Sequence, residues 1–429
     1  MCSDYVAGQL VLCFPKDDLA AQELIEDIQK EVIEHVSYGE SLQQVLGRLE
    51  LPADETLPFE FHRVHVPEGE EHWKITYLQF FYKHKLLGIL GREEGFTPEF
   101  VKCLSRSDLQ FTVAPNYVLS LAANLLPVHA ADFKFSQFHQ EYKLRLQLPP
   151  VPPANLDQVE ITIIDSGIAD DFAFPVPAFR RRNFVEPNNP LKVSDEIGHG
   201  TVVTSIIHDL APNARLTIYK VADREGRISE WDAVAALAAS AKANIVNLSL
   251  QFGLRDRVCQ ICGRESQSSR SAVFENIIGH AATPLPKSIF IGAAGNQGLG
   301  ELAFPARFGA VLAIGAINSN GDLSAESNFG NQYNDPGTPD NHFVCPGGDD
   351  TTDPPESIGS FNQKHLKEWH GTSFAAAYAT GVVANLMAQQ IGGPINYEAI
   401  LDQLRQNADT NSLNQYDPQK HGHGIMQFS

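Results

Sequence analysis

Five short apolar segments in the middle of the chain restrict the possible folds more than any other feature of the sequence. They are rich in Val, Ile, Leu and Ala and alternate little with polar residues: VEITIID (159–165), RLTIYKVA (215–222), NIVNLSL (244–250), SIFIGAA (288–294) and AVLAIGAI (310–317). Strands of this composition are covered on both faces, as in parallel sheets. Helical patterns separate several of them, notably at residues 201–209 and 230–243. The pattern predicts an α/β fold with a mostly parallel sheet and helices on both faces.

The first 125 residues show a different order of elements. Strand and helix patterns follow one another roughly as β-α-β-β-α-β, with an extra helix near 40–49: strands at 8–14, 59–66, 73–84, 109–115 and 117–122, and helices at 17–35 and 97–106. This order predicts a small α+β sandwich. The Pro-rich segment LPPVPPANL (148–156) predicts a stiff, extended linker. We therefore expect an α+β domain over 1–125, a linker over 126–156 and the α/β domain over 157–429.

Charge and targeting signals narrow the class of protein. The 429 residues carry 32 basic and 52 acidic side chains, a formal net charge of −20, which argues against a nucleic-acid partner because phosphate binding needs clustered Lys and Arg. No uncharged apolar run reaches the length of about 18 residues needed to span a bilayer. The N-terminal sequence MCSDYVAGQLVLCFPKDD fits neither a signal peptide nor a membrane anchor. With only six scattered cysteines, we expect a cytoplasmic protein without a disulfide framework or a membrane partner.

Four polar residues stand at strand ends or helix starts of the predicted sheet. Asp165 ends a strand, His199 lies between two glycines before a helix, Asn296 follows another strand, and Ser373 opens the apolar helical run 374–390. Each has an ordinary alternative: a turn-bonding Asp, a structural His, a left-handed turn Asn, an N-cap Ser. Together they supply the nucleophile, base, orienting carboxylate and amide donor of acyl transfer. Reactive groups of open α/β sheets gather at these carboxyl ends.

The motifs around these residues carry a family resemblance. IDSG (164–167), GHGT (198–201), AAGN (293–296) and HGTSFAAA (370–377) resemble, in the same order, the signature blocks of the subtilisin-like serine proteases. The resemblance implies a subtilisin-like, doubly wound, mostly parallel sheet. It implies a catalytic triad of Asp165, His199 and Ser373, with Asn296 in the oxyanion hole. It also implies a substrate-binding set formed by two segments: Ser249, Leu250 and Gln251, and Ala293, Ala294 and Gly295.

Three positions depart from the family pattern. Val202 stands where a second His is usual, and Ala377 stands where a Pro soon follows the nucleophile. Neither position carries chemistry. Gln251 replaces a usual Gly of the substrate-binding strand and adds a side chain near the cleft wall. Specificity therefore cannot be transferred from typical family members.

The N-terminal region resembles the inhibitory prodomain of the same family in its strand-helix order and in an extended, mostly apolar tail, APNYVLSLAANLLPVHA (114–130). This implies a serine endopeptidase made as a self-inhibited precursor, with protein or peptide substrates and its own N-terminal domain as inhibitor. We expect the tail to pair with the Leu250 segment as an added strand. We expect self-cleavage by Ser373 between about Leu119 and Ala131, which makes 126–156 a processing region as well as a linker.

Several alternatives stay open. The N-terminal region fits an unrelated α+β interaction domain, and the whole chain fits a catalytically silent relative that binds peptides as a scaffold or sensor. A nucleotide-binding domain is disfavoured, because neither G-x-G-x-x-G nor a P-loop follows the first strand of the α/β domain.

Metal ligands are sparse in the sequence. Cys259 and Cys262 form half of a zinc site that Cys345 and nearby histidines would have to complete, so a pair of free thiols is favoured. The acidic loop PGGDDTTDPPES (346–357) has no calcium-site spacing and fits a solvated loop. We expect no required cofactor and assign no metal site, although calcium binding fits the acidic loops.

Overall fold

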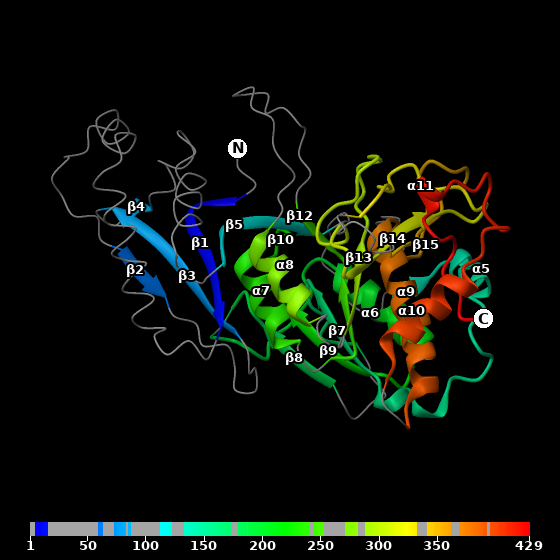
Figure 1. The fold of residues 1–429 in the computed structure, drawn as a ribbon, viewed down its shortest axis with the longest axis horizontal. Coiled ribbons are helices and arrows are strands. Elements are labelled where there is room, and N and C mark those ends of the chain that lie inside the picture. The colour runs from blue at the N-terminus through cyan, green and yellow to red at the C-terminus, as the bar shows by residue number, and fades with distance from the viewer. Residues whose placement is uncertain are drawn as a thin grey trace. The chain divides into compact units, whose positions relative to one another are not determined.

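The fold was analysed in a computed structural model (Figure 1). The structure describes residues 5–15, 59–62, 73–82, 85–86, 112–121, 133–172, 179–186, 188–240, 243–252, 271–281, 288–332, 341–361, 369–392 and 395–429. The chain divides into two compact units. The first comprises Met1–Val118, Ser229–Ala239 and Arg255–Ile277; the second comprises Leu119–Ile228, Ser240–Leu254 and Ile278–Ser429.

The first unit contains an antiparallel sheet. Its strands are β1 (Tyr5–Pro15), β2 (Phe59–His62), β3 (Trp73–Tyr82), β4 (Lys85–Leu86) and most of β5 (Thr112–Leu121). The order is β5-β1-β3-β2, with β4 on β3. This order agrees with the predicted β-α-β-β-α-β arrangement. The helices predicted at 17–35, 40–49 and 97–106 lie outside the described residues. Helix α7 (Glu230–Ala239) and the start of α8 (Ala272–Ala281) also belong to this unit.

One strand of this unit differs from the sequence prediction. Two strands were expected at 109–115 and 117–122, separated at Pro115-Asn116, but β5 runs without interruption from Thr112 to Leu121. The φ angle of proline is compatible with extended backbone, and Pro removes only one N–H from the ladder. A Pro-Asn pair therefore does not force a turn here.

The second unit is built on a seven-stranded parallel sheet, as predicted. Its strands are β7 (Glu160–Asp165), β8 (Phe179–Asn183), β9 (Arg215–Lys220), β11 (Ile245–Leu248), β13 (Ile289–Ala293), β14 (Val311–Ile317) and β15 (His342–Pro346). They lie in the order β15-β14-β13-β11-β7-β9-β8. The order reverses at β7, because later strands add on both of its sides. A crevice for ligands is expected at such a switch point, beyond the carboxyl end of β7.

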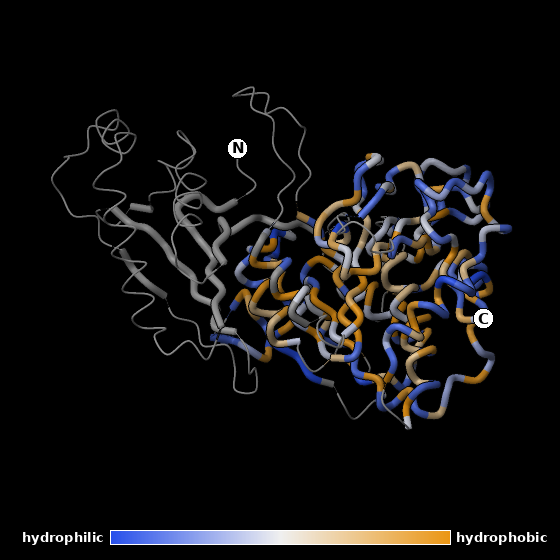
Figure 2. The backbone as a smooth tube through the Cα atoms, in the orientation of Figure 1, coloured by the Kyte–Doolittle hydropathy of each residue, from blue (hydrophilic) through white to orange (hydrophobic). Residues whose placement is uncertain are grey.

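Helices α6 (His199–Leu210) and α9 (Thr372–Gln390) pack against each other and against this sheet. Alternate strand residues, among them Ile161, Ile163, Ile289 and Ile291, share one core cluster with both helices. Every residue of α9 from Thr372 to Ala388 is buried, as its all-apolar composition predicts. The alternate residues of β11, β13, β14 and β15 are buried too, so these strands are covered on both faces. Figure 2 shows the hydropathy of each residue along the described backbone.

The predicted linker has more structure than its prolines suggest. It contains β6 (Phe133–Phe135), α5 (Gln137–Arg145) and the short 3-10 helix η2 (Ala154–Gln158). Tyr142, Leu146 and Leu156 are fully buried in the core of the second unit. The prolines at 149–153 lie between α5 and η2, and the three buried side chains anchor both flanking segments in the core.

Smaller elements complete the second unit. They are β10 (Arg227–Ser229), β12 (Leu250–Phe252), β16 (Gly359–Phe361), α10 (Tyr397–Asn407) and α11 (Pro418–His421). Strand β16 pairs with β6. Strand β12 pairs antiparallel with the last three residues of β5, Leu119–Leu121, which also belong to this unit. Among the described helices none is both long enough and apolar enough to cross a membrane.

Candidate active site

Asp165 and His199 meet at the switch point of the parallel sheet. Asp165 is the last residue of β7, and His199 is the first residue of α6. Asp165 Oδ1 lies 2.7 Å from His199 Nδ1, and both side chains are fully buried. A carboxylate can only accept a hydrogen bond, so Nδ1 carries the proton and neutral His199 presents the lone pair of Nε2. Nε2 is buried and makes no hydrogen bond within the described residues.

Two glycines make this approach possible. A Cβ on Gly200 would lie 2.3 Å from the Gly167 carbonyl oxygen and 3.1 Å from Asp165 Oδ1. Gly167 has φ +113°, and a Cβ there would lie 2.2 Å from the Val193 carbonyl oxygen. A side chain at position 200 would push the start of α6 away from the end of β7, and one at position 167 would push away the backbone of Val193 and Ser194. The glycines of IDSG and GHGT therefore stand where two backbone segments approach too closely for a side chain.

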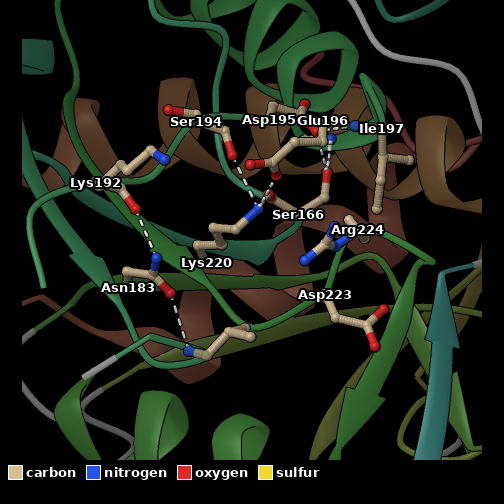
Figure 3. Close-up of polar contacts among 12 residues, drawn as sticks. Ser166, Asn183, Lys192, Ser194, Asp195, Glu196, Ile197, Lys220, Asp223 and Arg224 are labelled. Atoms are coloured by element: carbon tan, nitrogen blue, oxygen red, sulfur yellow. Dashed lines mark hydrogen bonds and ion pairs between the residues drawn. The ribbon is translucent and has the colours of Figure 1, made fainter. Parts of the chain in front are cut away.

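Asp195 holds the turn that leads into His199, a role that the sequence analysis missed. Its buried carboxylate accepts five hydrogen bonds, from the N–H groups of Ile197, Gly198 and Thr201 and from the hydroxyls of Thr201 and Ser166, at 2.6–3.0 Å. Figure 3 labels Asp195 with two of these partners, Ser166 and Ile197. Ser166 N donates to Asp165 Oδ1 at 2.7 Å, and Ser166 Oγ accepts from Gly200 N at 2.9 Å. One network thus fixes both partners of the Asp165–His199 pair.

A buried cation lies beside this network. Lys220 ends β9, and its Nζ donates to the carbonyl oxygens of Ser166 and Ser194, each at 2.9 Å, and to Glu196 at 2.6 Å (Figure 3). Its side chain is only 5% exposed. The one sequence signal for this residue is a lysine within the apolar run RLTIYKVA.

Ser373 is the second residue of α9, and it does not cap the helix. The N-cap is Gly371, which has no side chain that could cap the helix. Ser373 Oγ instead donates to the Ser249 carbonyl oxygen at 3.2 Å, while Ser249 Oγ donates to the Ser373 carbonyl oxygen at 2.9 Å. The N-cap alternative is therefore wrong. The ring of the next residue, Phe374, lies 5.4 Å from the ring of His199, centroid to centroid.

Asn296 is fixed beside Ser373 by the residue that precedes the serine. Its Oδ1 accepts from Thr372 N at 2.9 Å and from Thr372 Oγ1 at 2.7 Å. Because Oδ1 is held there, the amide group Nδ2 faces Gly371, where an added Cβ would lie 2.6 Å from Nδ2. Asn296 is not among the described residues with positive φ, so the left-handed-turn alternative is also wrong.

The two predicted substrate-binding segments lie next to each other. Ser249, Leu250 and Gln251 are buried in and before β12, and Ala293 and Ala294 are buried at the end of β13. A Cβ on Gly295 would lie 2.9 Å from Gln251 Oε1. The structure thus brings together the two segments that the sequence resemblance groups as substrate-binding.

One group of described residues has ligand atoms close enough to hold a metal ion: Glu326, Asp350 and His370, with all three atoms within 4.8 Å of one another. His370 makes ion-pair contacts of 3.5 Å with Glu326 and 3.9 Å with Asp350. Burial raises the pKa of Glu326, with a further rise from the charges of Asp350 and Asp349. This group lies apart from the Asp165–His199 pair in sequence, and we assign no metal to it.

The structure argues against one part of the zinc alternative. Cys345 is fully buried in the apolar core, where burial raises the pKa of its thiol. A thiolate ligand at this position is therefore disfavoured. Cys259 and Cys262 lie outside the described residues.

Known proteins are similar to this chain in sequence and in fold. Residues 157–424 match the model of the subtilase family of peptidases. The chain is 29% identical over 240 residues to alkaline elastase YaB of Bacillus sp. (strain YaB), covering 53% of each chain. It is 27% identical over 265 residues to a thermophilic serine proteinase of Bacillus sp. (strain AK1), covering 58% of this chain and 56% of that one. The chain thus matches about half the length of these curated relatives.

The fold is shared with a solved structure of low sequence similarity. The epidermin leader peptide processing serine protease of Staphylococcus aureus superposes with a TM-score of 0.55 at 16% identity, covering 98% of this chain and 97% of that one. The matched region of the sequence, residues 157–424, contains the whole Asp165–His199 and Ser373–Asn296 arrangement. This chain belongs to the subtilase family.

Proposed function

We propose that the protein is a serine endopeptidase with Asp165, His199 and Ser373 as its catalytic triad. The observation that carries the proposal is the buried contact of 2.7 Å between Asp165 and His199 Nδ1, which leaves Nε2 as a proton acceptor. The ring of His199 lies next to the residue that follows Ser373. A nucleophile, a base and a carboxylate that orients the base are the parts acyl transfer requires.

The reaction proceeds in two acyl-transfer steps. Ser373 Oγ leaves its bond of 3.2 Å to the Ser249 carbonyl, gives its proton to His199 Nε2 and attacks the substrate carbonyl carbon. His199 then donates that proton to the leaving amine, and water releases the acyl group by the same route in reverse. Asp165 stabilises the imidazolium through Nδ1. No metal or other cofactor takes part in these steps.

Asn296 stabilises the charge that develops on the substrate oxygen. Its Oδ1 accepts hydrogen bonds from Thr372, so the Nδ2 group lies on the side of Gly371, two residues before the nucleophile Ser373. The backbone N–H of Ser373, at the start of α9, is the second donor. Donors fixed before the reaction need no reorganisation when the oxyanion forms.

The enzyme is proposed to be made as a self-inhibited precursor, with its N-terminal region as the inhibitor. The pairing of Leu119–Leu121 with β12, directly beside Ser249, supports this proposal. A segment paired there fills the strand position that a peptide substrate would use. The cytoplasmic location and the absence of nucleic-acid and membrane partners stay predictions from the sequence.

Active-site labelling and kinetics test the reaction. Wild-type protein should react with one fluorophosphonate per chain and hydrolyse unstructured peptides, and Ser373→Ala should lose both activities. His199→Ala should lose about 10⁴-fold or more in kcat, because the triad acts as a unit. Asn296→Ala should keep the label and lose about 10²- to 10³-fold in kcat. A wild-type chain that folds and binds peptides but never reacts with the probe would support the scaffold alternative.

Mass spectrometry tests the precursor. Freshly purified wild-type protein should contain a cut between about Leu119 and Ala131, while Ser373→Ala should stay intact. The same cut in purified Ser373→Ala protein would assign the cleavage to another protease. An intact and fully active wild-type chain would make the N-terminal region a docking domain.

A further inference from the structure

Gln251 places an unpartnered acceptor in the wall of the site. The residue is the middle one of β12 and is 5% exposed. Its Oε1 is buried and makes no hydrogen bond within the part of the chain that the structure describes. The same oxygen would lie 2.9 Å from a Cβ on Gly295, which has a φ of +108° and directly precedes Asn296. The carboxamide of Gln251 therefore lies against the backbone that carries the oxyanion donor.

We expect the side chain of a bound substrate to lie next to the Gln251 carboxamide. Ser373 Oγ contacts the carbonyl oxygen of Ser249, the residue directly before β12. A substrate strand that pairs with β12 and places its reacting carbonyl at Ser373 must direct the side chain of that residue between the two wall segments. These segments are Ser249–Gln251 and Ala294–Asn296, and the Gln251 carboxamide lies between them.

The chain itself supplies a model for such a strand. Leu121 pairs with Leu250, and Ser120 pairs with Gln251, in antiparallel register. A substrate strand that kept this register would place its next residue opposite Ser249. The sequence has alanine at positions 122 and 123. The residue that would present its carbonyl to Ser373 therefore has the smallest side chain with a Cβ.

We propose that Gln251 sets the substrate preference of this site: it restricts the residue on the acyl side of the scissile bond to a small side chain, alanine or serine. The inference rests on the proposed peptidase function. A serine hydroxyl can also donate to Oε1 of Gln251, which otherwise stays unpaired. The chain's own processing bond is then Ala122–Ala123, cleaved by attack of Ser373 Oγ on the Ala122 carbonyl and release of the Ala123 amine.

Matched peptides that differ only at the acyl-side residue test the preference. Wild-type enzyme should give kcat/KM values for Ala and Ser about 10- to 200-fold above the value for Phe, the range that pocket volume can provide. Gln251→Gly should raise the ratio of the Phe value to the Ala value at least about 10-fold. Gln251→Met is the matched control: it keeps the bulk, so Ala should still exceed Phe, but it removes the acceptor, so any advantage of Ser over Ala should disappear.

The processing bond gives a second readout on the full-length chain. The mature N-terminus should be Ala123 by mass spectrometry, and Ala122→Phe should slow self-cleavage about 10-fold or more. Combining Ala122→Phe with Gln251→Gly should restore the rate. Equal hydrolysis of Ala and Phe peptides by wild type, or an unchanged Ala-to-Phe ratio in folded Gln251→Gly, would overturn the inference. Failure of the peptidase proposal looks different, because then no variant hydrolyses any peptide or takes the fluorophosphonate label.

Discussion

Acid should destabilise this protein through His342, the first residue of β15. The side chain is 1% exposed, and its Nε2 has no hydrogen-bond partner among the described residues. Burial, together with repulsion from the nearby His421 and His423, lowers the pKa of His342 from 6.5 to about 3. The folded protein therefore keeps this imidazole neutral over a pH range in which the unfolded chain would protonate it.

The sign and size of the effect follow from proton linkage. Because the unfolded state binds the extra proton, the free energy of unfolding falls as the pH drops below the ordinary pKa, and it keeps falling until the pH reaches the folded pKa of about 3. Each pH unit costs about 1.4 kcal/mol, so the loss from His342 between about pH 6.5 and pH 5 is about 2 kcal/mol. That is a substantial part of a typical stability of about 5–15 kcal/mol.

Urea unfolding at several pH values between about 7 and 5 measures this loss. All chains should carry Ser373→Ala, so that self-digestion does not interfere. His342→Leu should remove about 2 kcal/mol of the decrease. The remaining decrease includes the parts due to His421 and His208, whose pKa values burial also lowers. Val344→Ala, a core change in the same strand, should lower stability by the same amount at every pH. An equal decrease with pH in the parent chain and in His342→Leu would refute the reasoning.

Two further predictions concern the supports of the site. Asp195→Asn removes the charge of the carboxylate that accepts five hydrogen bonds around the His199 turn. We expect steady-state kinetics to show kcat about 10²-fold lower with KM nearly unchanged. A wild-type kcat would mean that Asp195 serves folding alone. Gly371→Ala places a Cβ 2.6 Å from Asn296 Nδ2, at a φ of +124°, so kcat should fall as in Asn296→Ala, about 10²- to 10³-fold. The double variant should be no slower than Asn296→Ala, and additive losses would contradict a shared cause.

The sequence alone determined the fold class and pointed to the residues that we propose as reactive. The strands β7, β11, β13 and β14 were visible because burial on both faces requires continuous β-branched runs, and that requirement is local. The edge strand β8 was missed because its sequence FRRRN has three arginines, which do not read as a buried run. Asp165, His199, Asn296 and Ser373 could be proposed from the sequence because each is flanked by a turn-forming motif within a few residues.

Only the tertiary structure decided how those residues are held and what limits access to them. The five hydrogen bonds of Asp195, the burial of Lys220, and the pairing of Leu119–Leu121 with β12 all join segments that are distant in sequence. The orientation of Gln251 toward Gly295 depends on how the end of β13 passes β12. Local patterns report which face of a strand or helix is buried, but they carry no information on which distant atom a buried polar group meets. That partner is set by the crossing of chain segments. It decides the geometry of the Asp165–His199 pair and, in our proposal, the size of the substrate side chain.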